Sequence, residues 1–310
     1  MDKMPCKNCQ EKPVIKLTNV NVSLCKQHFL RYFEKKVKKT IRTFNLIEKG
    51  NKIGIALSGG KDSFTVLSIL KQFQDKKIIT LEALAIDEGI KAYRDLTNAK
   101  KFCKDNNITL HILNYEDFFN HSLDKMVKKF KNKTPCSFCG VFRRYLLNYG
   151  SKKFKFDKLA TGHNLDDESQ SILMNQFRNN PEVSARLGPI TGVMIDKRFI
   201  RRIKPLYFVT EKETTTYSFL KGFPVKFSEC PYASFGYRNS VRDMLNEFEL
   251  KYLGTKYSIV DSFIKILPSL KQQFKEAKTL SSCKLCNEPT SKKICQACEY
   301  VRELKDYKNR

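Results

Sequence analysis

Short apolar runs alternate with amphipathic segments through the central part of the 310-residue chain. Apolar runs typical of buried strands lie at 52–57, 79–86, 109–113, 158–161 and 199–205. Helical spacing of apolar residues predicts helices at 61–73, 93–106, 117–131, 142–148, 165–177, 212–221, 238–248 and 258–273. Strands that alternate with helices in this way predict an α/β fold, in which a parallel sheet carries helices on both faces.

Three polar segments directly follow predicted strands. They occupy residues 58–63, 87–89 and 162–164. Ligands of open parallel sheets bind at the carboxyl ends of the strands, so we expect these segments along one rim although they are far apart in sequence. Residues 181–192, with two prolines and two glycines, are typical of a long loop.

The segment after the first strand, Ser58-Gly59-Gly60-Lys61-Asp62-Ser63, is typical of a phosphate-binding turn. Glycines let the main chain approach an anion, and the start of the next helix presents backbone N–H groups and the positive end of its dipole. A triphosphate is the expected ligand. The Walker loop has four residues between its first glycine and the Gly-Lys pair, so the spacing here does not favour transfer of the γ-phosphate.

Eight residues with metal-binding side chains form two quartets at the ends of the chain. The first comprises Cys6, Cys9, Cys25 and His28, and the second comprises Cys283, Cys286, Cys295 and Cys298. Pairs at these spacings are typical of closed tetrahedral zinc sites, which are usually structural and supply folding energy to short polar segments. We expect two Zn²⁺ ions, in zinc-binding modules at 1–32 and 276–310 that flank a central domain at 33–275.

Three further cysteines, Cys136, Cys139 and Cys230, lie in the central domain. The first two follow Pro135 at the start of a predicted helix, whose dipole would lower the pKa of a thiol. Three thiolates suit an iron–sulfur cluster that leaves one iron open to an exogenous ligand, commonly sulfide in a sulfur-transfer enzyme. A competing hypothesis makes Cys139 and Cys230 a persulfide and disulfide pair without a cluster. Spacing does not decide between them, and Cys103 is expected to be an ordinary thiol.

Basic residues dominate the charge of the chain, with 58 Lys and Arg against 32 Asp and Glu and a formal charge of +26. This excess, clustered with aromatic residues, implies a polyanionic partner and favours nucleic acid over a merely solvated surface. We expect contacts with an RNA backbone from Lys35, Lys36, Lys39, Arg201, Arg202 and Lys204. No apolar stretch is long enough to span a bilayer and the first residues lack a signal-peptide core, which predicts a cytoplasmic protein without a membrane partner.

Taken together, the motifs resemble those of the tRNA 2-thiouridine synthetases of the PP-loop, or N-type ATP pyrophosphatase, superfamily. The resemblance extends from Cys6 to Cys298 and rests on the turn at 58–63, Cys136-x-x-Cys139, Thr161-Gly162-His163-Asn164-Leu165-Asp166-Asp167, Arg202-x-Lys204-Pro205-Leu206, Cys230-Pro231-Tyr232 and both zinc quartets. Wobble-uridine thiolases of archaea and eukaryotes and thermophile thiolases of the T-loop uridine have these features. The resemblance implies a PP-loop fold like that of the adenine-nucleotide α-hydrolases.

The same resemblance implies the site residues. ATP-binding positions are matched by Ala56, Leu57, Ser58, Gly59, Gly60, Lys61, Asp62, Ser63, Ile86, Arg143, Gly162 and His163. Cluster ligands are matched by Cys136, Cys139 and Cys230, with a 4Fe-4S cluster favoured. Catalytic roles are expected for Asp62, Cys139, Cys230 and one of the neighbours Asp166 and Asp167, although both aspartates also suit the capping of a helix start. His163 lacks a second ligand at suitable spacing, which favours a phosphate or backbone contact over a metal.

The implied activity is ATP-dependent 2-thiolation of a tRNA uridine. The base leaves its stack, its C2 oxygen attacks the α-phosphate of ATP bound with Mg²⁺, and pyrophosphate leaves. Sulfur from a ubiquitin-like carrier or free sulfide then replaces the adenylated oxygen. The wobble uridine U34 is favoured over the T-loop uridine U54, and the family suggests a homodimer.

Two other functions stay open at this point. A non-catalytic module would hold tRNA with its zinc modules and basic surface and sense nucleotide with the turn. A synthetase that amidates another substrate would keep the fold but leave the three central cysteines without a role.

Overall fold

The computed structural model describes residues 5–17, 20–91, 93, 95–193, 196, 198–225, 230–232, 237–275 and 280–306. Its strands are β1 (Ile15–Leu17), β2 (Val22–Leu24), β3 (Lys52–Ala56), β4 (Thr80–Asp87), β5 (Leu110–Asn114), β6 (Lys158–Ala160), β7 (Arg201–Ile203), β8 (Ser281–Ser282) and β9 (Pro289–Thr290). Its helices are α1 (Lys26–Thr43), α2 (Lys61–Asp75), α3 (Thr97–Asp105), α4 (Tyr115–Phe119), α5 (Leu123–Lys129), α6 (Pro135–Lys153), α7 (Leu165–Phe177), α8 (Pro181–Ser184), α9 (Glu211–Leu220), α10 (Tyr237–Lys251), α11 (Thr255–Gln273) and α12 (Gln296–Asp306).

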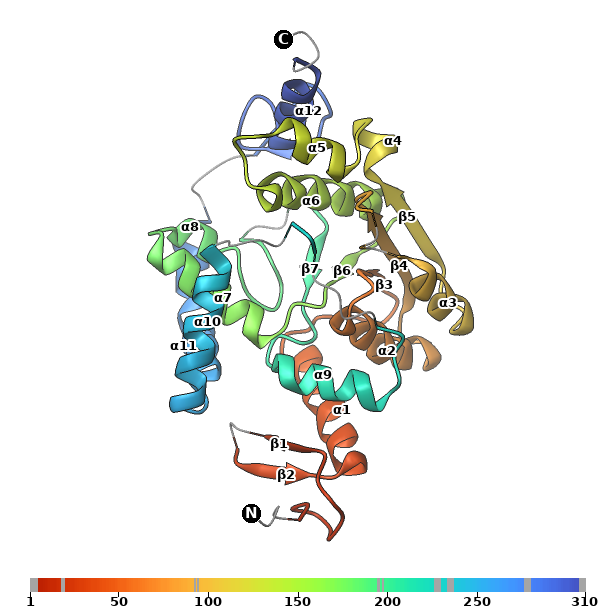
Figure 1. The fold of residues 1–310 in the computed structure, drawn as a ribbon, viewed down its shortest axis with the longest axis vertical. Helices are drawn as coiled ribbons and strands as arrows, with labels where there is room; N and C mark the ends of the chain where they lie inside the picture. The colour runs from red at the N-terminus through yellow and green to blue at the C-terminus, as the bar shows by residue number, and fades with distance from the viewer. Residues whose placement is uncertain are drawn as a thin grey trace.

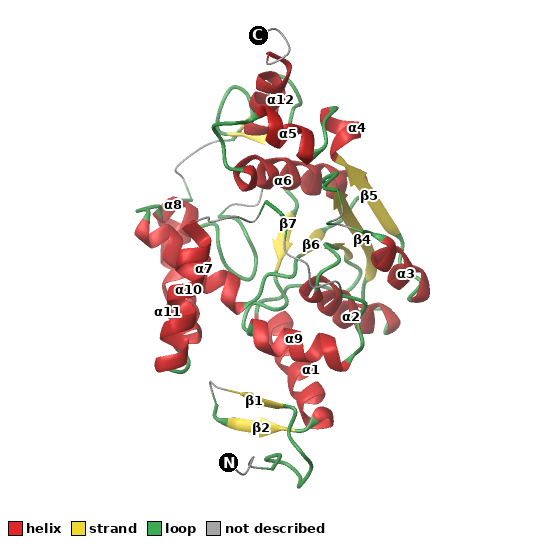
Figure 2. Ribbon diagram, in the orientation of Figure 1, coloured by secondary structure: helices red, strands yellow, loops and turns green. Residues whose placement is uncertain are grey.

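The central sheet has the strand order β5-β4-β3-β6-β7, and every neighbouring pair in it is parallel (Figure 2). Ile53 of the middle strand β3 is paired with Leu81 of β4 on one side and with Lys158 of β6 on the other. All carboxyl ends of the strands therefore meet at one rim. The α/β fold with a parallel sheet, expected from the hydrophobic pattern, is confirmed.

The two faces of the sheet carry separate hydrophobic cores, which β4 shows most directly. Its Leu81, Ala83 and Ala85 belong to one core, whereas Leu84 and Ile86 belong to the other, because successive side chains of a strand point to opposite faces. The first core takes in α1, α2, α3 and α9, and the second takes in α4, α5, α6 and α12 (Figure 1). Helices thus cover both faces, as a parallel sheet requires.

A third group of helices stands beside the sheet. Leu165 and Ile172 of α7 pack with Val260 and Phe263 of α11 in a separate buried cluster. Helix α10 packs against both α7 and α11, and Figure 1 shows these helices together with α8 on the left of the molecule. Because α7 begins at the rim of the sheet, it brings this helical group to the rim.

The two terminal modules are alike in construction. Each has a two-stranded antiparallel sheet, β1–β2 or β8–β9, followed by the start of a helix. Cys6 and Cys25 are part of the first core, and Cys283 and Cys295 are part of the second, so each module is anchored to one face of the central domain. Helix α1 runs unbroken through residue 32, so the first module and the central domain share this helix. Within the described part of the chain, no helix has the length and apolar character needed to cross a bilayer.

Several helices differ from the sequence prediction. The single helix predicted at 117–131 is two, α4 and α5, because Asn120 adopts a left-handed conformation (φ 55°) and Ser122 caps the next helix. The predicted helix at 142–148 extends to Pro135–Lys153, and the loop at 181–192 contains the short helix α8. The helix predicted at 93–106 begins only at Thr97, and residue 94 of that prediction lies outside the described residues.

Candidate active site

The phosphate-binding turn lies between the end of β3 and the first residues of α2. Gly59 has φ +80°, a conformation that glycine adopts without strain, and Gly60 is the N-cap of α2. The Gly60 N–H donates to Ser58 Oγ over 3.4 Å, and the Ser63 hydroxyl donates to the Gly60 carbonyl over 2.9 Å. These bonds shape a turn at which the first N–H groups of α2 are available to an anion.

A segment that follows β6 packs directly on this turn. Asn164 Nδ2 donates to Asp62 Oδ1 over 3.2 Å, across 102 residues of sequence. A Cβ on Gly162 would stand 2.9 Å from Asp62 Cβ and 3.0 Å from the Ser63 nitrogen, so only glycine permits this approach. The rim that the sequence predicts therefore exists, with its β3 and β6 segments in contact.

Lys61 is a fixed cation within the turn. Its Nζ lies 2.9 Å from Glu211 Oε1 and 3.1 Å from Asp62 Oδ2. Burial alone would lower the pKa of Lys61, but the two carboxylates raise it above its ordinary value, so the ammonium stays charged. Burial raises the pKa of Asp62, against the lowering effects of Lys61 and Asn164. A phosphate that enters the turn meets this charge directly.

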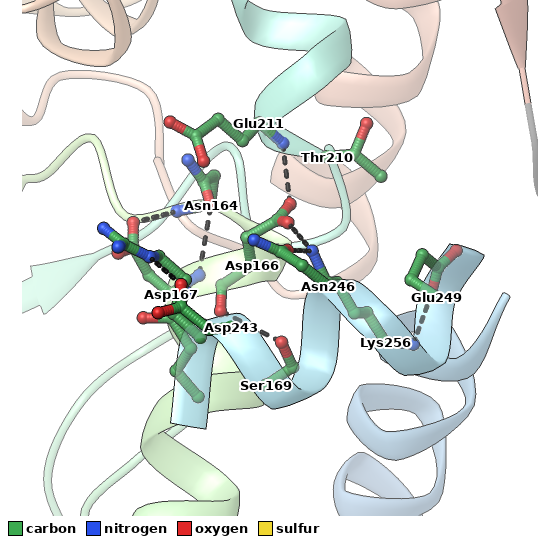
Figure 3. Close-up of polar contacts among 12 residues, drawn as sticks. Asn164, Asp166, Asp167, Ser169, Thr210, Glu211, Asp243, Asn246, Glu249 and Lys256 are labelled. Atoms are coloured by element: carbon green, nitrogen blue, oxygen red, sulfur yellow. Dashed lines mark hydrogen bonds and ion pairs between the residues drawn. The ribbon is translucent and has the colours of Figure 1, made fainter. Parts of the chain in front are cut away.

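The neighbours Asp166 and Asp167 have different surroundings (Figure 3). Asp166 is 8% exposed, and its Oδ2 accepts the backbone N–H of Glu211 at the start of α9 over 2.7 Å. Its Oδ1 binds the ammonium of Lys256 on α11, which also donates to Asn246 of α10 over 2.6 Å. Both carboxylate oxygens thus tie helices together, which favours a scaffold role for Asp166.

Asp167 is half-exposed at the first turn of α7. It forms a capping box with Asn164, whose backbone N–H donates to Asp167 Oδ2 over 3.2 Å. Its Oδ1 lies 3.4 Å from Arg238 Nη1. Burial, with repulsion from Asp62 and Glu168, raises the pKa of Asp167 to about 6, and Arg238 acts in the opposite direction. A carboxylate with a pKa near neutrality is suited to accept and return a proton.

His163 stands among cations at the same rim. Its Nδ1 lies 2.9 Å from Thr161 Oγ1. Desolvation by the surrounding protein and the charges of Lys204, Arg202 and Arg238 lower the pKa of His163, so the imidazole is neutral. Among the residues that the structure describes, His163 belongs to no set of metal-type ligands. The geometry favours a polar contact, as the sequence predicts, over a metal.

The three central cysteines come from two segments, the start of α6 and residues 230–232. Cys136 and Cys139 lie one turn apart at the start of α6, where Pro135 occupies the first turn. Cys136 Sγ lies 3.6 Å from the carbonyl oxygen of Tyr232, across 96 residues. Cys230 and Tyr232 pack against the same buried cluster that contains Cys139. The Cys-x-x-Cys and Cys-Pro-Tyr motifs therefore meet in the fold.

Cys139 is linked to the rim by an arginine. Arg143 Nη2 lies 3.4 Å from Cys139 Sγ and 2.9 Å from Oε1 of Glu88, which directly follows β4. Burial alone would lower the pKa of Arg143, but the neighbouring Glu88 raises it, so the guanidinium stays charged beside the Cys139 sulfur. The Tyr115 hydroxyl donates to the Cys139 carbonyl over 2.8 Å and fixes the backbone there.

Each terminal quartet has the geometry of a tetrahedral metal site. In the first, Cys25 Sγ and Cys9 Sγ lie 3.2 Å and 3.5 Å from His28 Nδ1, and the two sulfurs lie 3.7 Å apart. In the second, Cys286 Sγ and Cys295 Sγ lie 3.6 Å apart. Zinc–ligand bonds at tetrahedral angles place sulfurs about 3.8 Å apart and a sulfur about 3.6 Å from a nitrogen. All four ligand atoms of each quartet lie within 4.8 Å of one another.

Residues 29–247 of this chain match the PP-loop domain of a known protein family. That match covers the turn, the rim segments and the three central cysteines. The chain belongs to the PP-loop family. This assignment agrees with the fold, in which the glycine turn follows a strand of a parallel sheet.

Relatives of similar length place the chain among the tRNA 2-thiolation enzymes of the PP-loop family. The tRNA-5-methyluridine(54) 2-sulfurtransferase of Pyrococcus horikoshii is 36% identical over 299 residues, which cover 96% of this chain and 93% of that protein. The cytoplasmic tRNA 2-thiolation protein 1 of Dictyostelium discoideum is 34% identical over 309 residues, with coverage of 96% and 83%. The solved structure of the U34-tRNA thiolase NcsA from Methanococcus maripaludis, with its 4Fe-4S cluster, matches with a TM-score of 0.83, 31% identity and coverage of 98% and 97%.

The residues of this PP-loop enzyme that were predicted to bind RNA have different environments. Lys35 and Lys39 are exposed on α1, and Arg201 and Arg202 are half-exposed on β7. Burial and the charge of Arg144 lower the pKa of Arg202 to about 10. These positions are compatible with contact to a polyanion.

Two of the predicted RNA contacts, Lys36 and Lys204, have surroundings that disfavour contact with RNA. Lys204 is 5% exposed, and its Nζ lies 2.7 Å from Oε1 of Glu168, which is 1% exposed. Its ammonium therefore cannot reach a phosphate on the surface. Lys36 is partly exposed, and its Nζ lies 2.8 Å from Oε1 of the buried Glu213, an ion pair that competes with a phosphate contact. Neither ion pair could be read from the sequence, because both partners come from distant elements.

A groove of about 420 Å³ runs along α1 of the PP-loop enzyme. It is lined by Arg31, Glu34, Lys35, Lys38, Arg42 and Phe73. The four basic residues recur at helical spacing and share one face of α1. Lys38 lies 3.6 Å from Glu34, but within the described part of the chain no ion pair involves Arg31, Lys35 or Arg42. Their spacing is visible in the sequence and could have singled out this face.

Proposed function

We propose that this protein replaces the C2 oxygen of a tRNA uridine with sulfur and converts ATP to AMP and pyrophosphate. The observation that carries the proposal is the link from the rim to the sulfur side of the site: Arg143 contacts both Glu88, at the end of β4, and Cys139, on α6. One site can thus activate an oxygen and replace it. The relatives named for tRNA 2-thiolation support the substrate.

In the first half of the reaction, the adenylation of the base, each residue of the rim has its own role. The turn and the start of α2 hold the triphosphate, with Lys61 as counter-charge, and Mg²⁺ accompanies the nucleotide. The uracil C2 oxygen attacks the α-phosphorus, and the bond to the bridging oxygen breaks so that pyrophosphate leaves. The N3 proton of the uracil passes to Asp167. The base is then an electrophile at C2.

In the second half, sulfur takes the place of oxygen. A hydrosulfide attacks C2, its proton moves to N3, and AMP leaves with the former base oxygen. Arg143 keeps a positive charge beside Cys139 while this anionic nucleophile is present. The positive surroundings of His163 stabilise the phosphate of the departing AMP.

The donor set at α6 fits an iron–sulfur cluster with the three ligands Cys136, Cys139 and Cys230. Cys103, the remaining central thiol, lies in the core on the opposite face of the sheet, so the set has three members. When bound, such a cluster supplies an iron that is open to sulfide. We propose a 4Fe-4S cluster, because the Methanococcus thiolase contains one. A persulfide at Cys139 resolved by Cys230 is the alternative.

Zinc is the metal that we propose for the two terminal quartets. Three cysteines with one histidine, and four cysteines, are donor sets that zinc prefers in closed sites. Each quartet belongs to a small module with a two-stranded hairpin, and two cysteines of each quartet join a core of the central domain. Both ions therefore have a structural role, and neither takes part in the chemistry.

The groove on α1 is the surface that we propose for the tRNA backbone. Arg31, Lys35 and Arg42 offer cations that no acid of the described chain neutralises. Phosphate groups provide the matching charge, and the formal charge of +26 supports a long-range attraction. Arg202 lies nearer the rim and would contact the RNA close to the extruded base.

The wobble uridine U34 is the proposed target, with U54 as the second candidate. The Methanococcus thiolase is named for U34 and covers 98% of this chain at 31% identity, and the Pyrococcus enzyme is named for position 54 and covers 96% at 36% identity. We propose a ubiquitin-like carrier or free sulfide as the sulfur donor, a homodimer, and a cytoplasmic location, the last supported by the name of the Dictyostelium relative.

Products of a single anaerobic incubation test this function. The purified protein with ATP, sulfide and unmodified tRNA should give AMP, pyrophosphate and 2-thiouridine in the digested RNA. Formation of ADP and phosphate would contradict adenylation. Tight tRNA binding without any nucleotide turnover would instead favour the non-catalytic RNA-binding module, and mapping of the thionucleoside would decide between U34 and U54.

A further inference from the structure

Arg238, the second residue of α10, reaches across to α7 at the candidate catalytic carboxylate. Its Nη1 lies 3.4 Å from Asp167 Oδ1 and 3.2 Å from Gln170 Oε1, and its Nη2 donates to Ser171 Oγ over 3.0 Å. These three acceptors lie on consecutive turns of one helix. Because the guanidinium is a rigid planar fork, bonds to several of them fix its orientation.

The start of α10 is held against α7 at a second point. The guanidinium of Arg178, the C-cap of α7, lies 4.2 Å from the centre of the Tyr237 ring. Two cation contacts, one from each helix, thus fix the position from which Arg238 extends. Arg238 is therefore placed by the scaffold and is not an arbitrary surface side chain.

Nearby acids oppose the ionisation of Asp167, and Arg238 supplies a positive charge that offsets them. Asp62 of α2 and Glu168 of α7 are the acids that oppose ionisation of Asp167. Three cations of neighbouring elements are paired with other acids. Lys61 of α2 pairs with Asp62 and Glu211, Lys204 with Glu168, and Lys256 of α11 with Asp166. Among the residues that the structure describes, Asp167 has one ion pair, with Arg238.

We propose that Arg238 is a positioning residue, which orients Asp167 and supplies the positive charge that lets its carboxylate act as a proton acceptor. This inference rests on the proposed role of Asp167. Without Arg238, the carboxylate would face Asp62 and Glu168 uncompensated, and its pKa would rise. The acid limb of the pH–rate profile, where the rate falls as the pH is lowered, would then move to higher pH, because more of Asp167 would be protonated at any given pH.

The rate of AMP formation with tRNA, measured against pH, tests the proposal in the full-length protein loaded with its metals. Arg238→Gln should lower kcat, leave the KM for ATP within about two-fold, and move the acid limb upward by about one pH unit, a ten-fold loss on the acid side. Arg238→Lys should keep the limb in place with a reduced kcat, because it retains the charge but loses the fork. Arg242→Gln is the matched control, since Arg242 lies on the same helix and pairs with its neighbour Asp243 over 3.0 Å.

A second readout does not depend on turnover. The carboxyl carbon signal of Asp167 in protein labelled with carbon-13 aspartate, identified by its loss in Asp167→Asn, should titrate about one unit higher in Arg238→Gln. An unchanged titration and an unchanged acid limb would overturn the inference. Should Arg238→Gln not fold, a wild-type kcat in Arg238→Lys would overturn it. Full activity of Asp167→Asn would instead refute the proposed role of Asp167 and leave the ion pair itself untouched.

Discussion

The amide of Asn164 donates to the carboxylate of Asp62 over 3.2 Å and so joins the segment after β6 to the phosphate-binding turn. The same side chain caps α7, where its oxygen accepts the N–H of Asp167 over 3.1 Å. One residue thus sets the positions of two carboxylates of the proposed site. The nucleotide turn and the start of α7 behave as one structural unit.

Replacement of Asn164 by alanine should therefore damage both nucleotide binding and stability. We expect the loss of the cap to cost about 1 kcal/mol of unfolding free energy and the release of Asp62 to weaken ATP binding by about ten-fold. Denaturant unfolding and calorimetry with ATP measure the two effects. Asn114→Ala is the matched control, because Asn114 caps α4 by accepting the N–H of Asp117 but has no contact with the turn. Equal ATP affinity in the two variants would refute the coupling.

The two adjacent aspartates should respond differently to the same substitution. Asp166→Asn leaves the buried ammonium of Lys256 without its charge partner and should lower the unfolding free energy by about 3 kcal/mol. Asp167→Asn should leave stability within about 1 kcal/mol but reduce AMP formation by at least about a hundred-fold, since it removes the proposed proton acceptor. Asp243→Asn, at an exposed acid of α10, should change neither quantity. A stable but inactive Asp166→Asn protein would reverse the assignment.

Each zinc module should lose its metal independently. Cys25→Ser and Cys295→Ser should each reduce the zinc content by about one equivalent per chain and lower the melting temperature, because the ion supplies the folding energy of its module. Cys103→Ser should keep both ions, since this thiol is buried in α3 and, among the described residues, belongs to neither quartet. Elemental analysis with thermal unfolding makes the comparison. Loss of both ions in either quartet variant would contradict separate sites.

RNA binding should depend on the basic face of α1. The double substitution Lys35→Gln and Arg42→Gln should weaken tRNA binding and make its dependence on salt shallower, by about 0.9 in the log–log slope for each phosphate that the protein no longer neutralises. Binding titrations at several salt concentrations measure this slope. Lys251→Gln removes a basic residue that pairs with Glu247 on α10 and should leave the slope unchanged. An unaltered slope in the double variant would remove the groove from the RNA footprint.

Sequence alone predicted the parallel sheet, the rim and the grouping of the cysteines, because these depend on local periodicity and spacing. It could not separate Asp166 from Asp167, since the difference arises from Glu211 and Lys256, which the fold brings from 45 and 90 residues away. It placed Lys204 on the surface for the same reason, as Glu168 becomes its partner only when α7 and the segment after β7 meet. The spacing of apolar residues also did not predict the left-handed conformation of Asn120, which divides one expected helix into two.

The central claim, that ATP activates the base oxygen itself, is tested most directly by following that oxygen. Transfer RNA whose uracils carry oxygen-18 at C2 is incubated with ATP and sulfide, and the nucleotide products are analysed by mass spectrometry. Adenylation predicts that each 2-thiouridine formed releases one AMP with a single heavy oxygen in its phosphate, while pyrophosphate stays unlabelled. Heavy oxygen in pyrophosphate or inorganic phosphate, or AMP without the label, would contradict the account.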